Sequence, residues 1–139
     1  MSVYLDASVL VALFTDDAFS SRADAFLRRT APALIISDFA SAELAFATAR
    51  KCRVGMLSKA EAQAAFSDFD ACAVGRARRI EMGPADVAAA EAFLRRLDLT
   101  LGTADAINIA IAQRLGATLA TLDRKMAVAK TLGVMAEPI

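Results

Sequence analysis

The chain has 139 residues, a length typical of one domain built around one hydrophobic core. It contains no histidine, which excludes Ser-His-Asp and Cys-His catalysis and histidine-based zinc sites. Its 16 basic and 16 acidic residues give a formal net charge of zero, whereas a protein that binds polyanions usually has a basic surplus.

Short apolar runs predict buried strands, and apolar residues at helical spacing predict helices. In the first half of the chain these patterns predict a strand over 3–5, helices over 8–14 and 19–29, a strand over 34–36, a helix from its N-cap Ser37 to about 51–52, and a helix opened by the capping box of Ser58 and Glu61 that ends near Gly75.

Strands and helices are also predicted to alternate in the second half of the chain. The patterns predict a strand over 79–82, a helix from Pro84 to 97, a helix capped by Thr103 and ended by Gly116, a strand over 117–122, a helix over 124–132 ended by Gly133, and a strand over 134–136. Continuous apolar strands that alternate with helices favour a parallel sheet covered on both faces. We therefore expect a three-layer α/β/α sandwich formed as a single domain over residues 1–139.

The composition also bears on location and assembly. Hydrophobic residues make up 57% of the chain, which favours an apolar subunit or partner interface over a merely well-filled core. The apolar stretch 7–15 is too short to span a bilayer, and the N-terminus is predicted as a strand rather than a signal peptide. Cys52 and Cys72 form no CxxC pair and are expected to be free thiols, so we predict a cytoplasmic protein.

Four acidic residues occupy positions where ligands gather in such folds. Asp6 and Asp123 directly follow predicted strands, and ligands of open parallel sheets bind beyond the carboxyl ends of the strands. Asp105 lies in the first turn of a predicted helix, and Glu43 interrupts an otherwise apolar helical stretch.

Each of these residues also has a purely structural interpretation. Asp6 and Asp123 could cap the helices that follow them, and Asp105 could complement the positive end of its helix. Glu43 could form a salt bridge with Arg50, although its apolar neighbours make an unpaired carboxylate costly there.

Taken together, the four carboxylates favour a metal site. Carboxylates brought close together repel one another, and a hard divalent cation such as Mg²⁺ or Mn²⁺ relieves that repulsion. Such an ion supports hydrolysis of a phosphodiester bond without any histidine. Ser8, Asn108 and Thr121 are expected to hydrogen-bond to the ligands, with capping or core hydrogen bonding as their alternative roles.

Four motifs carry a resemblance to a known family. They are Tyr-Leu-Asp-Ala-Ser-Val-Leu at 4–10, Ser-Ala-Glu-Leu at 41–44, Thr-Ala-Asp-Ala-Ile-Asn-Ile-Ala at 103–110, and Thr-Leu-Asp-Arg-Lys at 121–125. In this order and spacing, over the whole chain, they resemble PIN domains and, more narrowly, the VapC-type toxins of toxin–antitoxin pairs. By position, Asp6, Glu43 and Asp105 match the three core acidic residues of that family, and Asp123 matches the more variable fourth.

The resemblance implies a PIN-like α/β/α sandwich and an endoribonuclease that depends on Mg²⁺ or Mn²⁺. It also implies frequent homodimers and a cognate antitoxin protein that inserts into the site and blocks it. Arg124 and Lys125 are the first candidates for binding RNA phosphates because they adjoin Asp123, and Arg50 is a further one. The other basic candidates are Lys51, Arg53, Arg76, Arg78 and Arg79.

Three other functions are weighed against this one. An aspartate-nucleophile phosphatase expects a second Asp two residues after the first, where this chain has Ser8. A receiver-type signalling module that binds Mg²⁺ needs adjacent acids directly after the first strand, and Asp16 and Asp17 come too late. The third is a PIN fold kept only as an interaction module, which the four intact acidic positions argue against.

Overall fold

A parallel sheet of five strands organises the computed structural model, which describes residues 2–30 and 32–139, the side chains of Thr30 and Pro138 excepted. The strands are β1 (Ser2–Leu5), β2 (Ala33–Ser37), β3 (Ala77–Ile80), β4 (Thr118–Thr121) and β5 (Ala136–Pro138). Their order across the sheet is β3-β2-β1-β4-β5.

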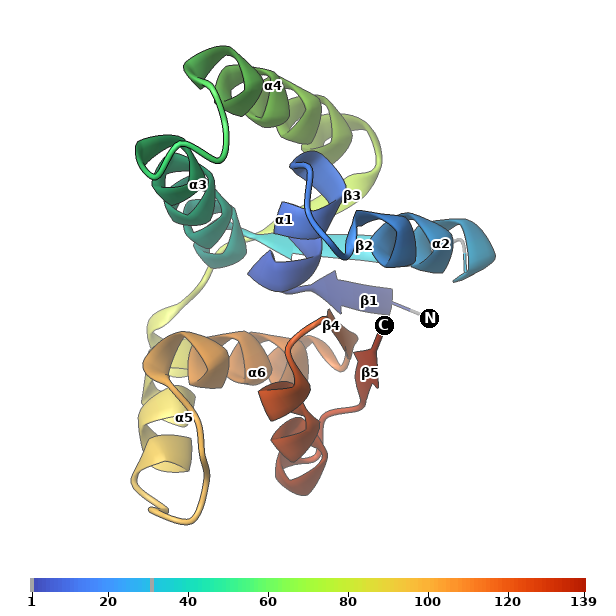
Figure 1. Cartoon of the computed structure of the whole chain (residues 1–139). Helices are drawn as coiled ribbons and strands as arrows, with labels where there is room; N and C mark the ends of the chain where they lie inside the picture. Colours follow the sequence, from blue (N-terminus) through green and yellow to red (C-terminus); the bar gives the residue numbers. More distant parts are fainter. Residues whose placement is uncertain (1, 31) are drawn as a thin grey trace.

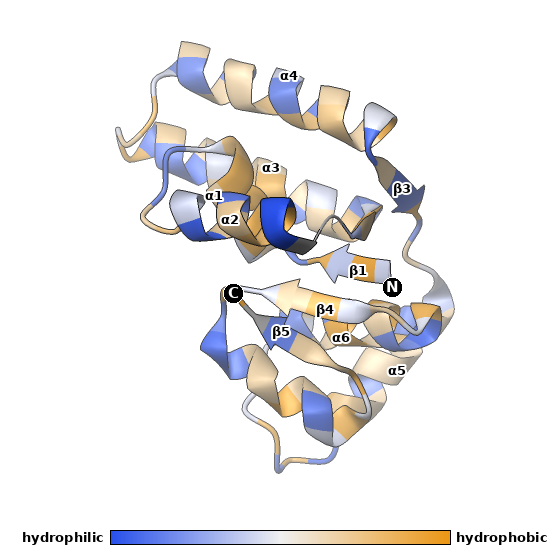
Figure 2. Cartoon of the chain, turned by 90° about the vertical axis from the view of Figure 1, so that its right-hand side faces the viewer, coloured by the Kyte–Doolittle hydropathy of each residue, from blue (hydrophilic) through white to orange (hydrophobic). Residues whose placement is uncertain are grey.

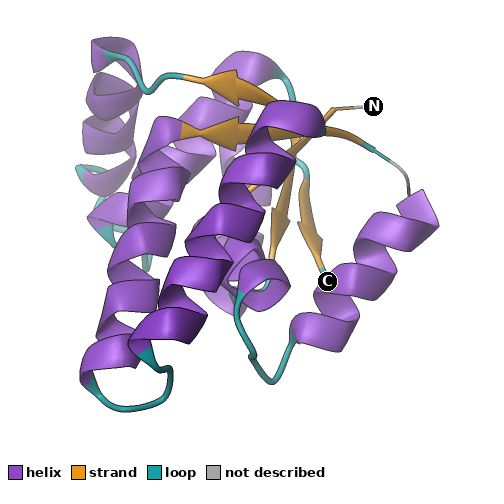
Figure 3. Ribbon diagram, turned by 90° about the horizontal axis from the view of Figure 1, so that it is seen from above, coloured by secondary structure: helices purple, strands orange, loops and turns teal. Residues whose placement is uncertain are grey.

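Helices cover both faces of this sheet. They are α1 (Ala7–Phe14), α2 (Ser20–Thr30), α3 (Asp38–Arg53), α4 (Lys59–Gly75), α5 (Pro84–Leu94), α6 (Thr103–Leu115) and the 3₁₀ helix η1 (Arg124–Leu132). The first four lie on one face, and α5, α6 and η1 lie on the other (Figure 1). Figure 3 looks down on the layer formed by α1–α4, with the strands beneath it. The predicted three-layer α/β/α sandwich is confirmed.

The hydrophobic core has two halves, one on each side of the sheet. Successive residues of β1 point to opposite faces, so Val3 and Leu5 pack with α1–α4 whereas Tyr4 packs with α6. Apolar colouring runs through the central strands between the two helical layers (Figure 2). Among the described residues, no helix combines the length and the apolar character needed to cross a bilayer.

The parallel register brings the ends of the central strands to one edge of the sheet. β1 lies between β2 and β4, with Leu5 opposite Ala120. The chain continues this pairing for one more step, because the backbone N–H of Asp6 donates to the carbonyl of Ala120 at 3.3 Å. Asp6 therefore lies beside the end of β4.

Local capping signals explain most of the helix boundaries. Ser37 accepts a hydrogen bond from the Ala40 N–H at 2.9 Å, and Ser58 and Glu61 form the predicted capping box. Gly116 ends α6 with a φ of 61°, a conformation that glycine adopts without strain. The cap predicted at Thr103 is wrong: Gly102 is the N-cap, and Thr103 is already helical.

Several other boundaries differ from the predicted ones, and for the two strands the reason is pairing with a neighbouring strand. β3 begins at Ala77, where it pairs with Leu34, instead of covering 79–82. β5 begins at Ala136, opposite Leu119, instead of covering 134–136. The helix predicted to reach residue 97 ends at Leu94. Leu97 has a φ of 65°, a left-handed backbone conformation that cannot be part of a right-handed α-helix. The segment 124–132 is a 3₁₀ helix.

A partly buried ion pair joins α5 to α6. The Asp86 carboxylate is 2% exposed, receives hydrogen bonds from Arg114 at 2.8 and 2.9 Å, and accepts the Gly83 N–H at 2.8 Å. Burial alone would raise the pKa of Asp86, but these hydrogen bonds outweigh it and hold the pKa below its ordinary value. The pair therefore stabilises the folded chain whenever Asp86 is ionised.

We expect Arg114→Met to lower the free energy of unfolding by about 2 kcal/mol at neutral pH, because the Asp86 carboxylate loses its charged hydrogen-bond donor while solvent near the half-exposed Arg114 limits the loss. Because the folded pKa of Asp86 lies below the unfolded value of about 3.9, this stabilisation is fully present above that pH. It is lost as the pH falls through the folded pKa. Urea denaturation at pH 7 and at about pH 3 measures both effects.

Arg95→Met is the matched control, because Arg95 forms an exposed i,i+4 pair with Glu91. We expect it to cost less than about 0.5 kcal/mol at either pH. An equal loss of stability in the two variants would contradict a structural role for the Asp86–Arg114 pair.

Candidate active site

Asp6 is a buried carboxylate at the junction between β1 and α1. It is the N-cap of α1, is 5% exposed, and accepts hydrogen bonds from the Val9 N–H at 3.2 Å and the Ser8 hydroxyl at 2.5 Å. Burial raises the pKa of Asp6, although hydrogen bonds from Ser8, Thr121 and the backbone oppose the rise. Asp6 thus has the capping role that the sequence suggested, and burial disfavours its charged form.

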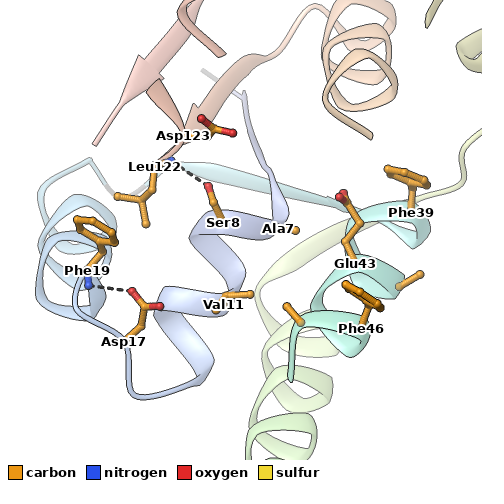
Figure 4. Close-up of a pocket in the computed structure, with 12 residues that line it drawn as sticks. Ala7, Ser8, Val11, Asp17, Phe19, Phe39, Glu43, Phe46, Leu122 and Asp123 are labelled. Carbon is orange, nitrogen blue, oxygen red and sulfur yellow. Dashed lines mark hydrogen bonds between the residues drawn. The ribbon is translucent and has the colours of Figure 1, made fainter. Parts of the chain in front are cut away.

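Ser8 and Thr121 connect Asp6 to the segment after β4. The Ser8 hydroxyl donates to Asp6. It also accepts the Leu122 N–H at 2.9 Å (Figure 4). The Thr121 hydroxyl accepts the Asp123 N–H at 3.0 Å. These two side chains therefore fix the start of α1 against the loop that carries Asp123.

Glu43 projects from the second turn of α3 and is half-buried. Its Oε1 accepts a hydrogen bond from the Asn108 amide at 2.7 Å, so Glu43 is partnered by Asn108 of α6 rather than by Arg50. Burial raises the pKa of Glu43, the Asn108 hydrogen bond opposes the rise, and the charges of Asp6 and Asp105 add to it.

Asp105 and Asp123 lie beside the same edge of the sheet. Asp105 is in the first turn of α6, where burial and the charge of Asp123 raise its pKa, while the Gly102 N–H and the charge of Lys125 oppose the rise. Asp123 is the N-cap of η1 and accepts the Lys125 N–H at 3.0 Å. Both residues therefore also have the helix-end roles that the sequence suggested.

Some of the four predicted acidic residues lie close enough for their charges to affect one another. Glu43 is affected by the charges of Asp6 and Asp105, and Asp105 by the charge of Asp123. Their all-oxygen chemistry fits a hard divalent cation. Among the residues that the structure describes, no three acidic or thiol side chains form a ready-made ligand set, so binding an ion would require the carboxylates to move closer.

Two further polar residues at the site, Tyr4 and Ser37, were not among the predicted site residues. The Tyr4 hydroxyl donates to Asn108 Oδ1 at 2.5 Å and lies 2.7 Å from the Ser37 hydroxyl. Tyr4 is fully buried, and this burial raises the pKa of its phenol. A signal existed in the sequence: Tyr4 lies two residues before Asp6, so strand alternation places the two side chains on one face.

An apolar hollow of about 650 Å³ lies beside Glu43 and Asp123 (Figure 4). Its walls come from α1, α3, the segment that precedes α2 and the segment that follows β4. Phe19, Phe39 and Phe46 contribute much of its apolar wall. A smaller hollow of about 300 Å³ shares Phe46 with it and is lined by Arg50.

The predicted RNA-binding residues lie around these features. Arg124 and Lys125 are exposed directly after Asp123, whereas Arg50 lies about two turns along α3 from Glu43. All three are open to solvent, so their side chains are accessible to a ligand.

Comparison with known proteins agrees with this architecture. The sequence model of the PIN domain family matches residues 3–132. VapC20 of Mycobacterium tuberculosis, a toxin that cleaves the sarcin-ricin loop, superposes with a TM-score of 0.74 and 19% identity over 91% of this chain and 94% of that one. No curated protein matches the sequence.

Two further solved structures share the fold. VapBC2 of Rickettsia felis, bound to promoter DNA, gives a TM-score of 0.70 and 17% identity over 99% of this chain and 98% of that one. A toxin–antitoxin complex of Klebsiella pneumoniae gives a TM-score of 0.66 and 21% identity over 99% of both chains. Since the family match spans nearly the whole sheet and its helices, this chain belongs to the PIN domain family.

Proposed function

We propose that this protein is a cytoplasmic endoribonuclease that depends on Mg²⁺ or Mn²⁺ and acts as the toxin of a toxin–antitoxin pair. The observation that carries the proposal is the convergence of four acidic positions on the carboxyl edge of the sheet. Asp6 is hydrogen-bonded to the end of β4, and Asp123 follows that strand. Glu43 is hydrogen-bonded to α6, the helix that carries Asp105. Membership of the PIN domain family supports the nuclease activity, and the toxins that share the fold support the biological role.

In this proposal Asp6, Glu43, Asp105 and Asp123 would hold the divalent ion. Such an ion would supply an acidified water for hydrolysis of a phosphodiester and positive charge for the leaving oxygen. Ser8 keeps the Asp6 carboxylate oriented, and Asn108 does the same for Glu43. Arg124 and Lys125 bind the RNA backbone next to the carboxylates and position the scissile bond.

We expect Asp6→Asn and Asp105→Asn each to lower metal-dependent RNA cleavage by at least about 100-fold, because each removes a charge that the ion requires. Neither change removes side-chain volume, so the circular dichroism spectrum should stay that of the wild type. Cleavage of a fluorescent RNA with Mg²⁺ or Mn²⁺ measures the effect.

Asp70→Asn is the matched control, since Asp70 is exposed on α4, and it should cleave at the wild-type rate. Full activity of the Asp6 or Asp105 variant, in preparations free of other nucleases, would refute the site. A wild-type protein without metal-stimulated cleavage would instead favour a PIN fold kept only for interaction.

Binding of RNA phosphates by Arg124 and Lys125 predicts a specific dependence on salt. Replacing both by alanine in the Asp6→Asn background should weaken RNA binding and reduce the slope of log affinity against log salt by about 0.7 for each phosphate that the protein no longer neutralises. Fluorescence anisotropy over a range of salt concentrations measures this slope. Arg95→Ala is the control, because Arg95 lies just after α5 and pairs with Glu91. An unchanged slope would contradict phosphate binding by these two residues.

The hollow beside the carboxylates supports an antitoxin as the partner protein. Its wall is mostly aromatic and aliphatic, and Phe46 at its rim is 64% exposed. Glu43 and Asp123 are among the residues that line it. An apolar segment with a basic side chain matches both features, and a partner bound there would cover the acidic residues.

Expression of this protein should arrest growth of a host that contains the target RNA, and co-expression of a small protein encoded next to it should relieve the arrest. Phe46→Ser should weaken that relief, because it removes exposed apolar area from the hollow. Growth curves with and without the neighbouring protein measure both effects. Val74→Ser, at a 90% exposed position of α4, is the control. Equal relief for both variants would place the antitoxin elsewhere.

The homodimer implied by the family stays a prediction. Several large apolar side chains outside the hollow are exposed and could be covered by a second copy of the chain. Among them are Val54, Met56, Val87, Leu97 and Met135.

A further inference from the structure

We infer that Tyr4 is a positioning residue for Glu43, acting through the Asn108 amide to hold one carboxylate oxygen in place while the other stays free for a divalent cation. The inference rests on the proposed function in that it concerns the same carboxylate group. The buried phenol of Tyr4 would thus orient the Glu43 carboxylate, which none of the four acidic residues can do by itself.

The hydrogen bonds between these residues run in one direction. The Tyr4 hydroxyl has one hydrogen, which it donates to Asn108 Oδ1 at 2.5 Å. The Ser37 hydroxyl, 2.7 Å away, is therefore the donor to the Tyr4 oxygen, while it accepts the Ala40 N–H. The Asn108 amide then donates to Glu43 at 2.7 Å, so the series ends on the carboxylate.

The orientation of the Asn108 amide follows from three contacts. Its nitrogen donates to Glu43 and also to the Ala104 carbonyl at 3.2 Å, and its oxygen accepts from Tyr4. A reversed amide would place its oxygen against a carboxylate and a carbonyl at once. Tyr4 supplies the only donor to that oxygen among the described residues, so it favours the orientation that directs the amide nitrogen to Glu43.

Burial protects this arrangement from competition by water. Tyr4 and Ser37 are fully buried, and Asn108 is 3% exposed. Glu43 itself is half-buried, and the structure gives its second carboxylate oxygen no donor among the described residues. One oxygen is thus held by protein, and the other is available to an ion.

The same strand consequently positions two acidic residues. Tyr4 is in β1, and Asp6 directly follows that strand. Asp6 is placed by the backbone and by Ser8, whereas Glu43, on a different helix, is placed through the phenol and the amide. The hydrogen bond from Asn108 to Glu43 links α6 to α3 across the edge of the sheet.

The test is Tyr4→Phe, which removes the hydroxyl and keeps the ring. We expect about 10-fold weaker Mn²⁺ binding, measured by electron paramagnetic resonance of free Mn²⁺, because outer hydrogen-bond partners influence metal affinity to this extent. In RNA cleavage we expect kcat to fall while KM stays unchanged. Wild-type Mn²⁺ affinity in the variant would overturn the inference.

Thr48→Val is the matched control. Thr48 lies on α3 like Glu43, and its hydroxyl is buried and has no hydrogen-bond partner among the described residues. The variant therefore also removes one buried hydroxyl, and it should bind Mn²⁺ as the wild type does. A loss equal to that of Tyr4→Phe would overturn the inference, because any buried hydroxyl would then have the same effect.

A measurement on the wild-type protein covers the case in which Tyr4→Phe does not fold. Asn108 is the only asparagine, and Gln63 and Gln113 are the only glutamines, so the side-chain amide signals in a nitrogen-15 NMR spectrum are few. Titration with Mg²⁺ should shift the Asn108 amide signals and leave those of exposed Gln63 in place. The inference would be overturned if the Asn108 signals stayed in place at a Mg²⁺ concentration that calorimetry shows to saturate the protein.

These experiments separate the inference from the proposed function. A wild-type protein that binds Mn²⁺ more tightly than Tyr4→Phe but cleaves no RNA would refute the nuclease and support the role of Tyr4. A nuclease for which Tyr4→Phe matches the wild type would refute the role of Tyr4 alone. A wild-type protein that binds no Mn²⁺ would overturn both.

Discussion

Burial of carboxylates at one edge of the parallel sheet, with repulsion between some of them as a smaller effect, is the constraint to which the surrounding residues respond. Burial raises the pKa of Asp6, Glu43 and Asp105, and neighbouring acidic charges add to the rise for the latter two. Each carboxylate has a nearby donor that offsets part of this cost, such as Ser8 for Asp6 and Asn108 for Glu43. The folded chain thus tolerates the acidic residues, and a divalent cation would offset the part of the electrostatic cost that these donors leave.

Helix ends contribute to that tolerance. Asp6 and Asp123 cap α1 and η1, and Asp105 lies in the first turn of α6. The N-terminus of a helix carries partial positive charge and unpaired N–H groups, both of which stabilise a carboxylate. Capping and ligand binding are therefore compatible roles for these residues. Glu43 lies further along its helix, so it depends on an amide from another element.

Much of this organisation was predictable from local patterns. Short apolar runs followed by Asp6 and Asp123 indicated strand ends, and the caps at Ser37 and Ser58 follow from their own side chains. Boundaries set by a neighbouring strand were predicted less well. β3 and β5 begin where they pair with Leu34 and Leu119, and no residue within either segment encodes that register. The 3₁₀ geometry of η1 was likewise not apparent from apolar spacing.

By itself, the sequence determined the chemistry available to this protein: no histidine, three acidic residues at strand and helix ends with a fourth inside a helix, and the alternation of strands and helices that produces a parallel sheet. Only the tertiary structure decided how those groups meet. The pairing of β1 with β4, and the approach of α6 to α3, bring residues far apart in sequence to one edge. The partners of Glu43 and Tyr4 follow from that approach, because a hydrogen bond between distant residues depends on packing, and local sequence patterns report only on residues a few positions apart.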